Sequence, residues 1–225
     1  MKVNHILFGL QNTLYDAVLQ LSMARMSAIK AMIAEGLPLN EESTYMMLED
    51  VVKEYGVHYP RHFDVLSERL GVKFSPRIVA AGVLAYREAS NVYLKPYPDV
   101  FETLIKLRDK GIRLHVITSG PPVKQWQKIL ALNLGHLFHE VFIEERTDIM
   151  SGFSKGFLGN VIEQLNADRK NLLLVSGIVS EINSVAELDV SSALVLRGSA
   201  KYKTEETKAS ATYTLNSLHE LLKIV

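Results

Sequence analysis

The segment Ile6-Leu7-Phe8-Gly9-Leu10 decides the fold, because it is a short apolar run that is followed by the polar residues Gln11 and Asn12. Such a run is typical of a buried strand in a parallel sheet. Four more runs of this kind follow, at residues 114–117, 141–143, 172–175 and 193–196. Helical patterns separate them, at residues 99–110, 122–132, 156–165 and 180–188, and a last one covers 215–222. This alternation predicts an α/β fold, in which helices cover both faces of a Rossmann-like parallel sheet.

Residues 16–90 interrupt the alternation with helical patterns and no strand. The first pattern ends at Gly36, and Asn40 and Ser75-Pro76 are signals for the start of two later helices. We therefore predict two parts. They are an α/β core made of residues 1–15 and 91–225, and an all-helical cap subdomain made of residues 16–90.

The ligand site of such a sheet lies at the carboxyl ends of its strands. Three strand ends meet there, and their residues are Gly9–Gln11, Thr118–Ser119 and Ser176–Gly177. We expect them around one crevice. The hydroxyl groups of Thr118 and Ser119 stand at the start of a predicted helix, where they either bind an anion or simply cap the helix.

The composition excludes several classes of protein. Lys and Arg number 25 and Asp and Glu number 25, so the net charge is +0 and nothing favours nucleic acid or an anionic membrane as a partner. The chain has 0 cysteines, which excludes disulfides and thiolate metal sites. No apolar stretch approaches the roughly 18–20 residues of a membrane span. The expectation is a soluble cytoplasmic protein.

Several segments resemble a known family. Ile6 to Asp16 resembles the first motif of the haloacid dehalogenase superfamily, whose form is hydrophobic-F-D-L-D-N-T-L. Tyr97-Pro98-Asp99-Val100 and Val116-Ile117-Thr118-Ser119-Gly120 resemble its second motif. Ala31 to Pro38 and Pro122 to Leu130 are similar to archaeal glyceraldehyde 3-phosphate phosphatases of that superfamily. The resemblance implies a hydrolase fold with a helical cap.

The resemblance also implies a set of catalytic groups. A first aspartate attacks the substrate, and a second protonates the leaving oxygen and then activates water. A serine or threonine at the end of the second strand binds the transferring group, and a lysine offsets negative charge. Acidic residues after the fourth strand hold Mg²⁺ together with the first aspartate.

Most of these groups are missing at the matching positions. The first aspartate position is Gly9 and the second is Gln11, an amide that is not a useful acid or base near neutral pH. The expected glycine and aspartate after the fourth strand are Ser176-Gly177. The later acidic position falls on Ile182, or on Glu181 with a shift of one residue. Thr118 matches the family residue, and Ser119 follows it.

The family lysine has no clear counterpart. Counting from the predicted strand at 141–143 places it near Ser151, and counting from the following helix places it at Gly152. Lys155 lies about one helical turn further on. Together with Thr118 and Ser119, it is a candidate ligand for a weakly bound phosphate or sulfate.

The sequence therefore predicts a pseudoenzyme, a phosphatase-like protein without catalysis that has lost the Mg²⁺ site of the family and serves binding or assembly. A homodimer or a protein partner would use the cap. One alternative is an active phosphatase for a small phosphorylated metabolite, with a relocated site that uses Glu144, Glu145 or Asp148. Another is a sensor that binds a phosphorylated metabolite without turning it over.

Overall fold

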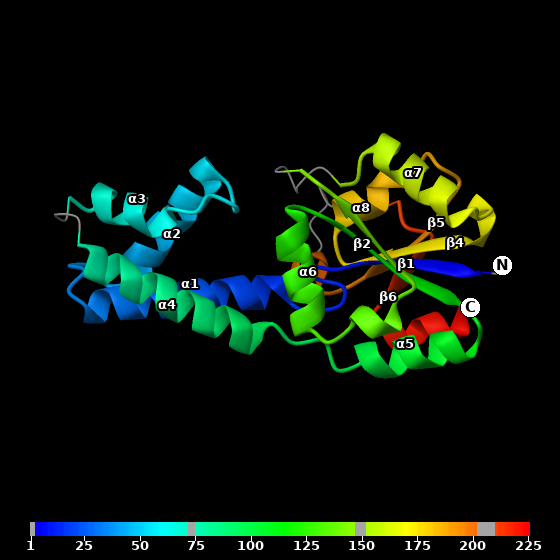
Figure 1. Cartoon of the computed structure of the whole chain (residues 1–225), viewed down its shortest axis with the longest axis horizontal. Helices are drawn as coiled ribbons and strands as arrows, with labels where there is room; N and C mark the ends of the chain where they lie inside the picture. The colour runs from blue at the N-terminus through cyan, green and yellow to red at the C-terminus, as the bar shows by residue number, and fades with distance from the viewer. Residues whose placement is uncertain (1–2, 72–74, 147–151, 202–209) are drawn as a thin grey trace. The chain divides into compact units, whose positions relative to one another are not determined.

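The computed structural model describes residues 3–71, 75–146, 152–201 and 210–225 (Figure 1). The chain divides into two compact units, one formed by Met1–Val18 with Leu94–Val225 and the other by Leu19–Tyr93. The sequence prediction placed both boundaries three residues earlier in the chain.

The first unit contains a six-stranded sheet in which every neighbouring pair of strands is parallel. Its strand order is β3-β2-β1-β4-β5-β6. The strands are β1 (His5–Gly9), β2 (Arg113–Ser119), β3 (Glu140–Glu144), β4 (Leu172–Ser176), β5 (Ser191–Val195) and β6 (Tyr213–Leu215). The prediction of an α/β fold with a parallel sheet is therefore confirmed. Strand β6 was not predicted, because its three residues are too few to show a strand pattern.

Helices cover both faces of this sheet (Figure 1). They are α5 (Val100–Asp109), α6 (Pro122–Ala131), α7 (Lys155–Leu165), α8 (Val179–Ser184) and the 3₁₀-helices η1 (Gly135–Leu137), η2 (Arg169–Asn171), η3 (Gly198–Lys201) and η5 (Leu218–Lys223). One apolar cluster joins the sheet to α5, α6 and η5, and a second joins it to α7 and α8. The range 215–222 was predicted to be the last helix. In the structure, Leu215 ends β6, and the 3₁₀-helix η5 begins at Leu218.

Strand β1 lies at the centre of this arrangement. Ile6 and Phe8 belong to the first apolar cluster, whereas Leu7 belongs to the second, as expected for side chains that alternate between the faces of a strand. Because β2 and β4 flank β1, the carboxyl end of β1 at Gly9 lies between two other strand ends. The centre of the predicted crevice is therefore at Gly9.

In the second unit, the residues that the structure describes form helices joined by turns and loops, and none of them forms a strand. Its helices are α1 (Ala17–Ala34), α2 (Glu41–Tyr55), α3 (His62–Arg69) and α4 (Pro76–Tyr93). Asn40 caps α2, since its side chain accepts a hydrogen bond of 2.8 Å from the Ser43 amide. Ile29, Met32 and Leu66 form part of the core of this unit.

Helix α1 is 18 residues long and apolar enough, by length and composition, to cross a membrane. The prediction that no stretch approaches that length was therefore too strict. However, Ala24, Ala28, Ile29 and Met32 on this helix are fully buried. A core helix passes the same test of length and composition, and 33% of this stretch is buried inside the structure.

Candidate functional site

The loop after β1 is tied to the loop after β4. The Gly177 amide donates a hydrogen bond of 2.8 Å to the Thr13 hydroxyl oxygen, and that hydroxyl donates one of 3.2 Å to the Gln11 carbonyl oxygen. Asn12 has a left-handed backbone with φ 54°, a conformation that asparagine tolerates better than most residues. These contacts fix the backbone beside Gly9.

A buried carboxylate stands beside Gly9. A Cβ atom on this glycine would lie 2.7 Å from Glu181 Oε2, and 3.0 Å from both Ser176 Oγ and Thr13 Oγ1. The Ser176 hydroxyl donates a hydrogen bond of 2.6 Å to Glu181 Oε2. Glu181, on α8, is only 5% exposed, so the sequence alternative that named Glu181 is the one that reaches the site. Ile182 is buried in the apolar cluster instead.

Burial controls the charge of Glu181. Burial raises the pKa of its carboxyl group to about 7, while the hydrogen bond from Ser176 and the charge of Arg146 act in the opposite direction. A buried carboxylate is costly unless a cation or hydrogen-bond donors compensate it. The charged form of Glu181 would therefore be stabilised by a cation at this position.

A second group of polar side chains surrounds Gln11. The Thr118 hydroxyl donates a hydrogen bond of 3.1 Å to Gln11 Oε1, and Gln11 Nε2 donates one of 3.3 Å to Gln125 Oε1. The Lys128 ammonium lies 3.4 Å from the same oxygen of Gln125. Burial, and then the charge of Lys124, lower the pKa of Lys128 to about 8. Gln11 is thus joined through Gln125 to a partly buried cation.

Sequence reasoning missed Gln125 and Lys128. Both lie on α6, which begins three residues after β2 ends at Ser119. Residues three apart share one face of a helix, so their spacing could have placed both on the face directed at the strand ends.

Gly177 owes its identity to packing. A Cβ atom there would lie 1.9 Å from the Asn12 carbonyl oxygen, a distance that excludes any side chain on this backbone. The aspartate that the resemblance implies at this position is therefore sterically incompatible with the observed loop. Ser176 and Ser119 are both buried at the ends of their strands.

Lys155 lies elsewhere. It is the first residue of α7, and its ammonium pairs with Glu187. Both side chains are about three-quarters exposed, and no described contact joins Lys155 to Thr118 or Ser119. Its expected role in anion binding is therefore not supported by the geometry. Gly152 has φ +71°, and a Cβ atom there would lie 2.1 Å from a carbonyl oxygen, while Ser151 falls outside the described residues.

Of the carboxylates expected in a relocated site, the two that the structure describes, Glu144 and Glu145, make no described contact with Gly9 or Gln11. Glu144 ends β3, where it accepts a hydrogen bond of 3.2 Å from the Ser154 amide and lies 3.5 Å from Arg146. Glu145 is exposed, and Asp148 falls outside the described residues. Among the described residues, the carboxylate that lies against Gly9 is that of Glu181.

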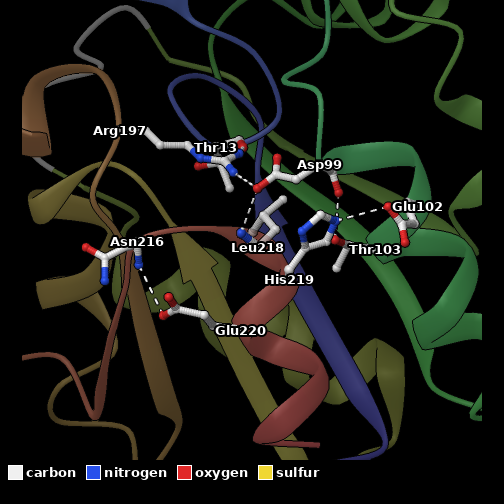
Figure 2. A network of polar contacts seen from close by, with 9 residues as sticks. All are labelled: Thr13, Asp99, Glu102, Thr103, Arg197, Asn216, Leu218, His219 and Glu220. Carbon is white, nitrogen blue, oxygen red and sulfur yellow. Dashed lines mark hydrogen bonds and ion pairs between the residues drawn. The ribbon is translucent and has the colours of Figure 1, made fainter.

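A buried ion pair between Arg197 and Asp99 contacts the loop after β1 at Thr13. Figure 2 shows Arg197 between Asp99 and Thr13: its guanidinium pairs with the Asp99 carboxylate and donates a hydrogen bond of 2.9 Å to the Thr13 carbonyl oxygen. Asp99 also accepts a hydrogen bond of 2.9 Å from the Leu218 amide. Arg197 lies 4.3 Å over the Tyr97 ring. Arg197 and Asp99 are positioning residues for this loop.

The oxygen atoms at the strand ends are of the kind that bind a divalent cation. The described residues contain no group of three or more His, Asp or Glu side chains placed to hold a metal. Mg²⁺, however, is usually held by one or two carboxylates, with waters and substrate phosphates as the other ligands. Glu181 supplies one buried carboxylate, and the Gln11 carbonyl oxygen lies in the adjoining loop. Glu181 would supply the carboxylate ligand of such an Mg²⁺, with a phosphorylated substrate and waters as the other ligands.

The family follows from comparison with known sequences. The haloacid dehalogenase-like hydrolase family matches residues 3–182. The chain belongs to this family. The resemblance seen in the sequence is therefore confirmed.

Named relatives and solved structures agree with this assignment. A glyceraldehyde 3-phosphate phosphatase of Methanopyrus kandleri is 46% identical over 158 residues, which are 69% of this chain and 68% of the relative. One of Pyrococcus abyssi is 35% identical over 98% of this chain and 92% of its own. A hydrolase of this family from Bacillus subtilis, solved with magnesium bound, has a TM-score of 0.69 at 16% identity, covering 100% of this chain and 99% of its own.

Two predictions from the sequence are overturned by these relatives. The interpretation as a pseudoenzyme is wrong, because relatives that are 31–46% identical over most of the chain are named phosphatases. The prediction that the Mg²⁺ site is lost is also contradicted, because the chain belongs to a family in which a solved structure holds magnesium. The physical reason lies in Glu181, which brings one buried carboxylate from α8 to a position beside Gly9.

Proposed function

We propose that this protein is a phosphatase that hydrolyses a small phosphorylated metabolite, of the size and class of a triose phosphate, in the cytoplasm. The observation that carries the proposal is the buried carboxylate of Glu181 at the carboxyl end of β1, where Gly9 leaves room for it. The names of the archaeal relatives support the choice of substrate class.

The strand ends offer donors to the phosphate group of the substrate. Thr118 and Ser119 have hydroxyl groups at the end of β2, and the loop after β1 has backbone amides. Glycine and glutamine at positions 9 and 11 bring no negative charge that would repel an anion. Glu181 and the Gln11 carbonyl oxygen would hold Mg²⁺, which supplies positive charge to the phosphate oxygens when bound.

Hydrolysis in this site would transfer the phosphoryl group directly to water. A bond forms between phosphorus and the water oxygen, the ester bond to the alcohol oxygen breaks, and one proton of the water ends on phosphate or solvent. Residue 9 cannot form a covalent intermediate because glycine has no side chain. Phosphoryl transfer depends mainly on positioning and charge stabilisation, and the residues described above provide both.

The test is phosphate release by pure protein. Glyceraldehyde 3-phosphate is assayed with and without Mg²⁺, for the wild type, for Glu181→Gln and for the surface control Glu187→Gln. We expect the wild type to turn over the substrate with Mg²⁺. Glu181→Gln should lose about 10–100-fold of this activity, as is usual when a group that holds or orients a metal is removed. Glu187→Gln should keep the activity of the wild type. Equal activity of Glu181→Gln and the wild type would overturn the proposal.

A binding measurement separates anion recognition from turnover. Thermal unfolding is followed in inorganic phosphate and in chloride of equal ionic strength, for the wild type and Thr118→Val. Phosphate stabilises proteins generally, so both proteins should show some rise in Tm. A specific site gives a larger rise in Tm for the wild type than for Thr118→Val. Self-association or partner binding through the helical unit stays a prediction, which light scattering on pure protein would check.

A further inference from the structure

The proposed hydrolysis lacks a proton donor at the usual place. When the ester bond breaks, the alcohol oxygen of the substrate carries negative charge and gains from a proton. Gln11 stands where the resemblance implies an acid, and its amide has no proton to give near neutral pH. Another group must therefore protonate the leaving oxygen.

Lys128 is the cation nearest to Gln11 in the described contacts. Gln11 Nε2, Thr118 Oγ1 and Lys128 Nζ lie 3.3, 3.4 and 3.4 Å from the same atom, Gln125 Oε1. Gln125 is itself fully buried, so this shared acceptor holds the three groups together. The ammonium of Lys128 is thereby separated by a single shared acceptor atom from the amide of Gln11, which stands where the family acid would be.

The charge of Lys128 has no carboxylate partner among the described residues. The lysines with ion pairs, such as Lys106 with Glu102 and Lys155 with Glu187, are exposed. Lys128 instead contacts the neutral Gln125, and burial lowers its pKa to about 8. A lysine with a pKa of about 7–8 is well matched to proton transfer near neutral pH.

We propose that Lys128 is the general acid of the reaction, donating a proton to the alcohol oxygen of the substrate as the phosphorus–oxygen bond breaks. The electron pair of that bond goes to the alcohol oxygen, which takes the proton from Nζ, and the neutral amine is protonated again by solvent. This inference rests on the proposed phosphatase function and adds a catalytic residue to it.

Few charged groups act on Lys128. Lys124, one helical turn earlier, lowers its pKa by repulsion. The strands packed against α6 are β2 and β3, and their charged residues are Arg113, Glu140 and Glu144. Arg113 and Glu140 begin their strands, at the opposite edge of the sheet, and Glu144 is engaged with Ser154 and Arg146.

The test compares two leaving groups. Glycerol 3-phosphate releases an alcohol that needs a proton, whereas 4-nitrophenyl phosphate releases a stable phenolate that does not. With Mg²⁺ present, we expect Lys128→Met to lower kcat on glycerol 3-phosphate by about 10²–10⁴-fold, the usual contribution of a general acid. On 4-nitrophenyl phosphate the loss should stay below about threefold. Lys106→Met, a surface lysine on α5, serves as the control and should change neither rate.

Lys128→Arg keeps the charge but holds its proton too tightly to donate it. Lys128→Arg should show the same selective loss of kcat on glycerol 3-phosphate. It also allows the test to be made if Lys128→Met does not fold. The alkaline limb of the kcat profile, expected near pH 8 in the wild type, should disappear in it. An equal loss on both substrates would overturn the inference but not the phosphatase. No phosphate release by the wild type from these two substrates or from glyceraldehyde 3-phosphate would overturn both.

Discussion

The carboxylate of Glu181 occupies the space that a side chain on residue 9 would fill. A Cβ atom on Gly9 would lie 2.7 Å from Glu181 Oε2, closer than a carbon and an oxygen can approach without displacement. A side chain at position 9 of β1 and the Glu181 side chain of α8 would therefore compete for the same space.

Gly9→Ala should lower the free energy of unfolding by about 1–3 kcal/mol, because the added methyl overpacks a buried site. In a Glu181→Ala background the same change should cost less, although Ser176 and Thr13 remain at 3.0 Å. Urea denaturation of the wild type, both single variants and the double variant measures this coupling.

Gly159→Ala is the matched control for this cycle. It lies within α7, and a Cβ atom there meets nothing within 4 Å. We expect a gain of up to about 1 kcal/mol from higher helix propensity. Strictly additive effects of Gly9→Ala and Glu181→Ala would show that the two residues do not compete for space.

The fold could be predicted because its signals are local. The apolar runs of β1 to β5 are long enough to show a strand pattern, and the helices between them end in recognisable signals. Strand β6 was not predicted because Tyr213–Leu215 is too short to show a strand pattern. The range 215–222 has the apolar spacing of a helix, although the structure forms η5 there only from Leu218.

The site was harder to predict because chemistry depends on proximity in space. Comparing Gly9 with the family aspartate, position by position, suggested that a carboxylate had been lost. The carboxylate that remains beside Gly9 is Glu181, from an element 172 positions further along the chain, and only the packing of α8 against β4 brings it there. The sequence left Glu181 and Ile182 as alternatives, since a shift of one residue on a short helix cannot be settled by pattern.

Stability should fall as the pH drops from about 6.5 to about 4. His115 is 1% exposed and stacks on His5 with ring centroids 5.3 Å apart. Burial, then the charges of His5, His139 and Arg113, lower the pKa of His115 to about 4. Between these pH values the unfolded chain binds the proton and the folded chain does not, so acid favours unfolding, by up to about 3 kcal/mol.

Chemical denaturation at several pH values checks this dependence. His115→Phe removes the titrating ring while keeping an aromatic side chain in the core. Its free energy of unfolding should therefore change less between pH 6.5 and pH 4 than that of the wild type. Identical pH slopes for the two proteins would assign the acid sensitivity to other groups.

Lys155→Met should leave phosphate release unchanged and alter stability by less than about 0.5 kcal/mol, because Lys155 and Glu187 form an exposed ion pair. The same substitution at Lys128 should abolish most turnover of glycerol 3-phosphate. Parallel assays of the two variants measure the contrast. A loss of activity in Lys155→Met would place that lysine in the site after all.

Removing one partner of the buried pair between Arg197 and Asp99 should be strongly destabilising. Both side chains are about one-tenth exposed, and either single change leaves a buried charge uncompensated, at a cost of about 3–5 kcal/mol. Arg197→Met also removes the donor to the Thr13 carbonyl oxygen (Figure 2). Because Thr13 accepts a hydrogen bond from Gly177, the loop after β1 should lose its fixed position as well.

The double variant Arg197→Met with Asp99→Asn separates stability from positioning. It leaves no uncompensated charge, so its free energy of unfolding should exceed that expected from the two single losses added together. The Thr13 carbonyl oxygen still lacks its donor, however, and phosphate release should stay low even where the protein is folded. Urea denaturation and phosphate release on the four proteins measure both effects. Full activity in the folded double variant would show that this ion pair supports the fold without positioning the loop beside Gly9.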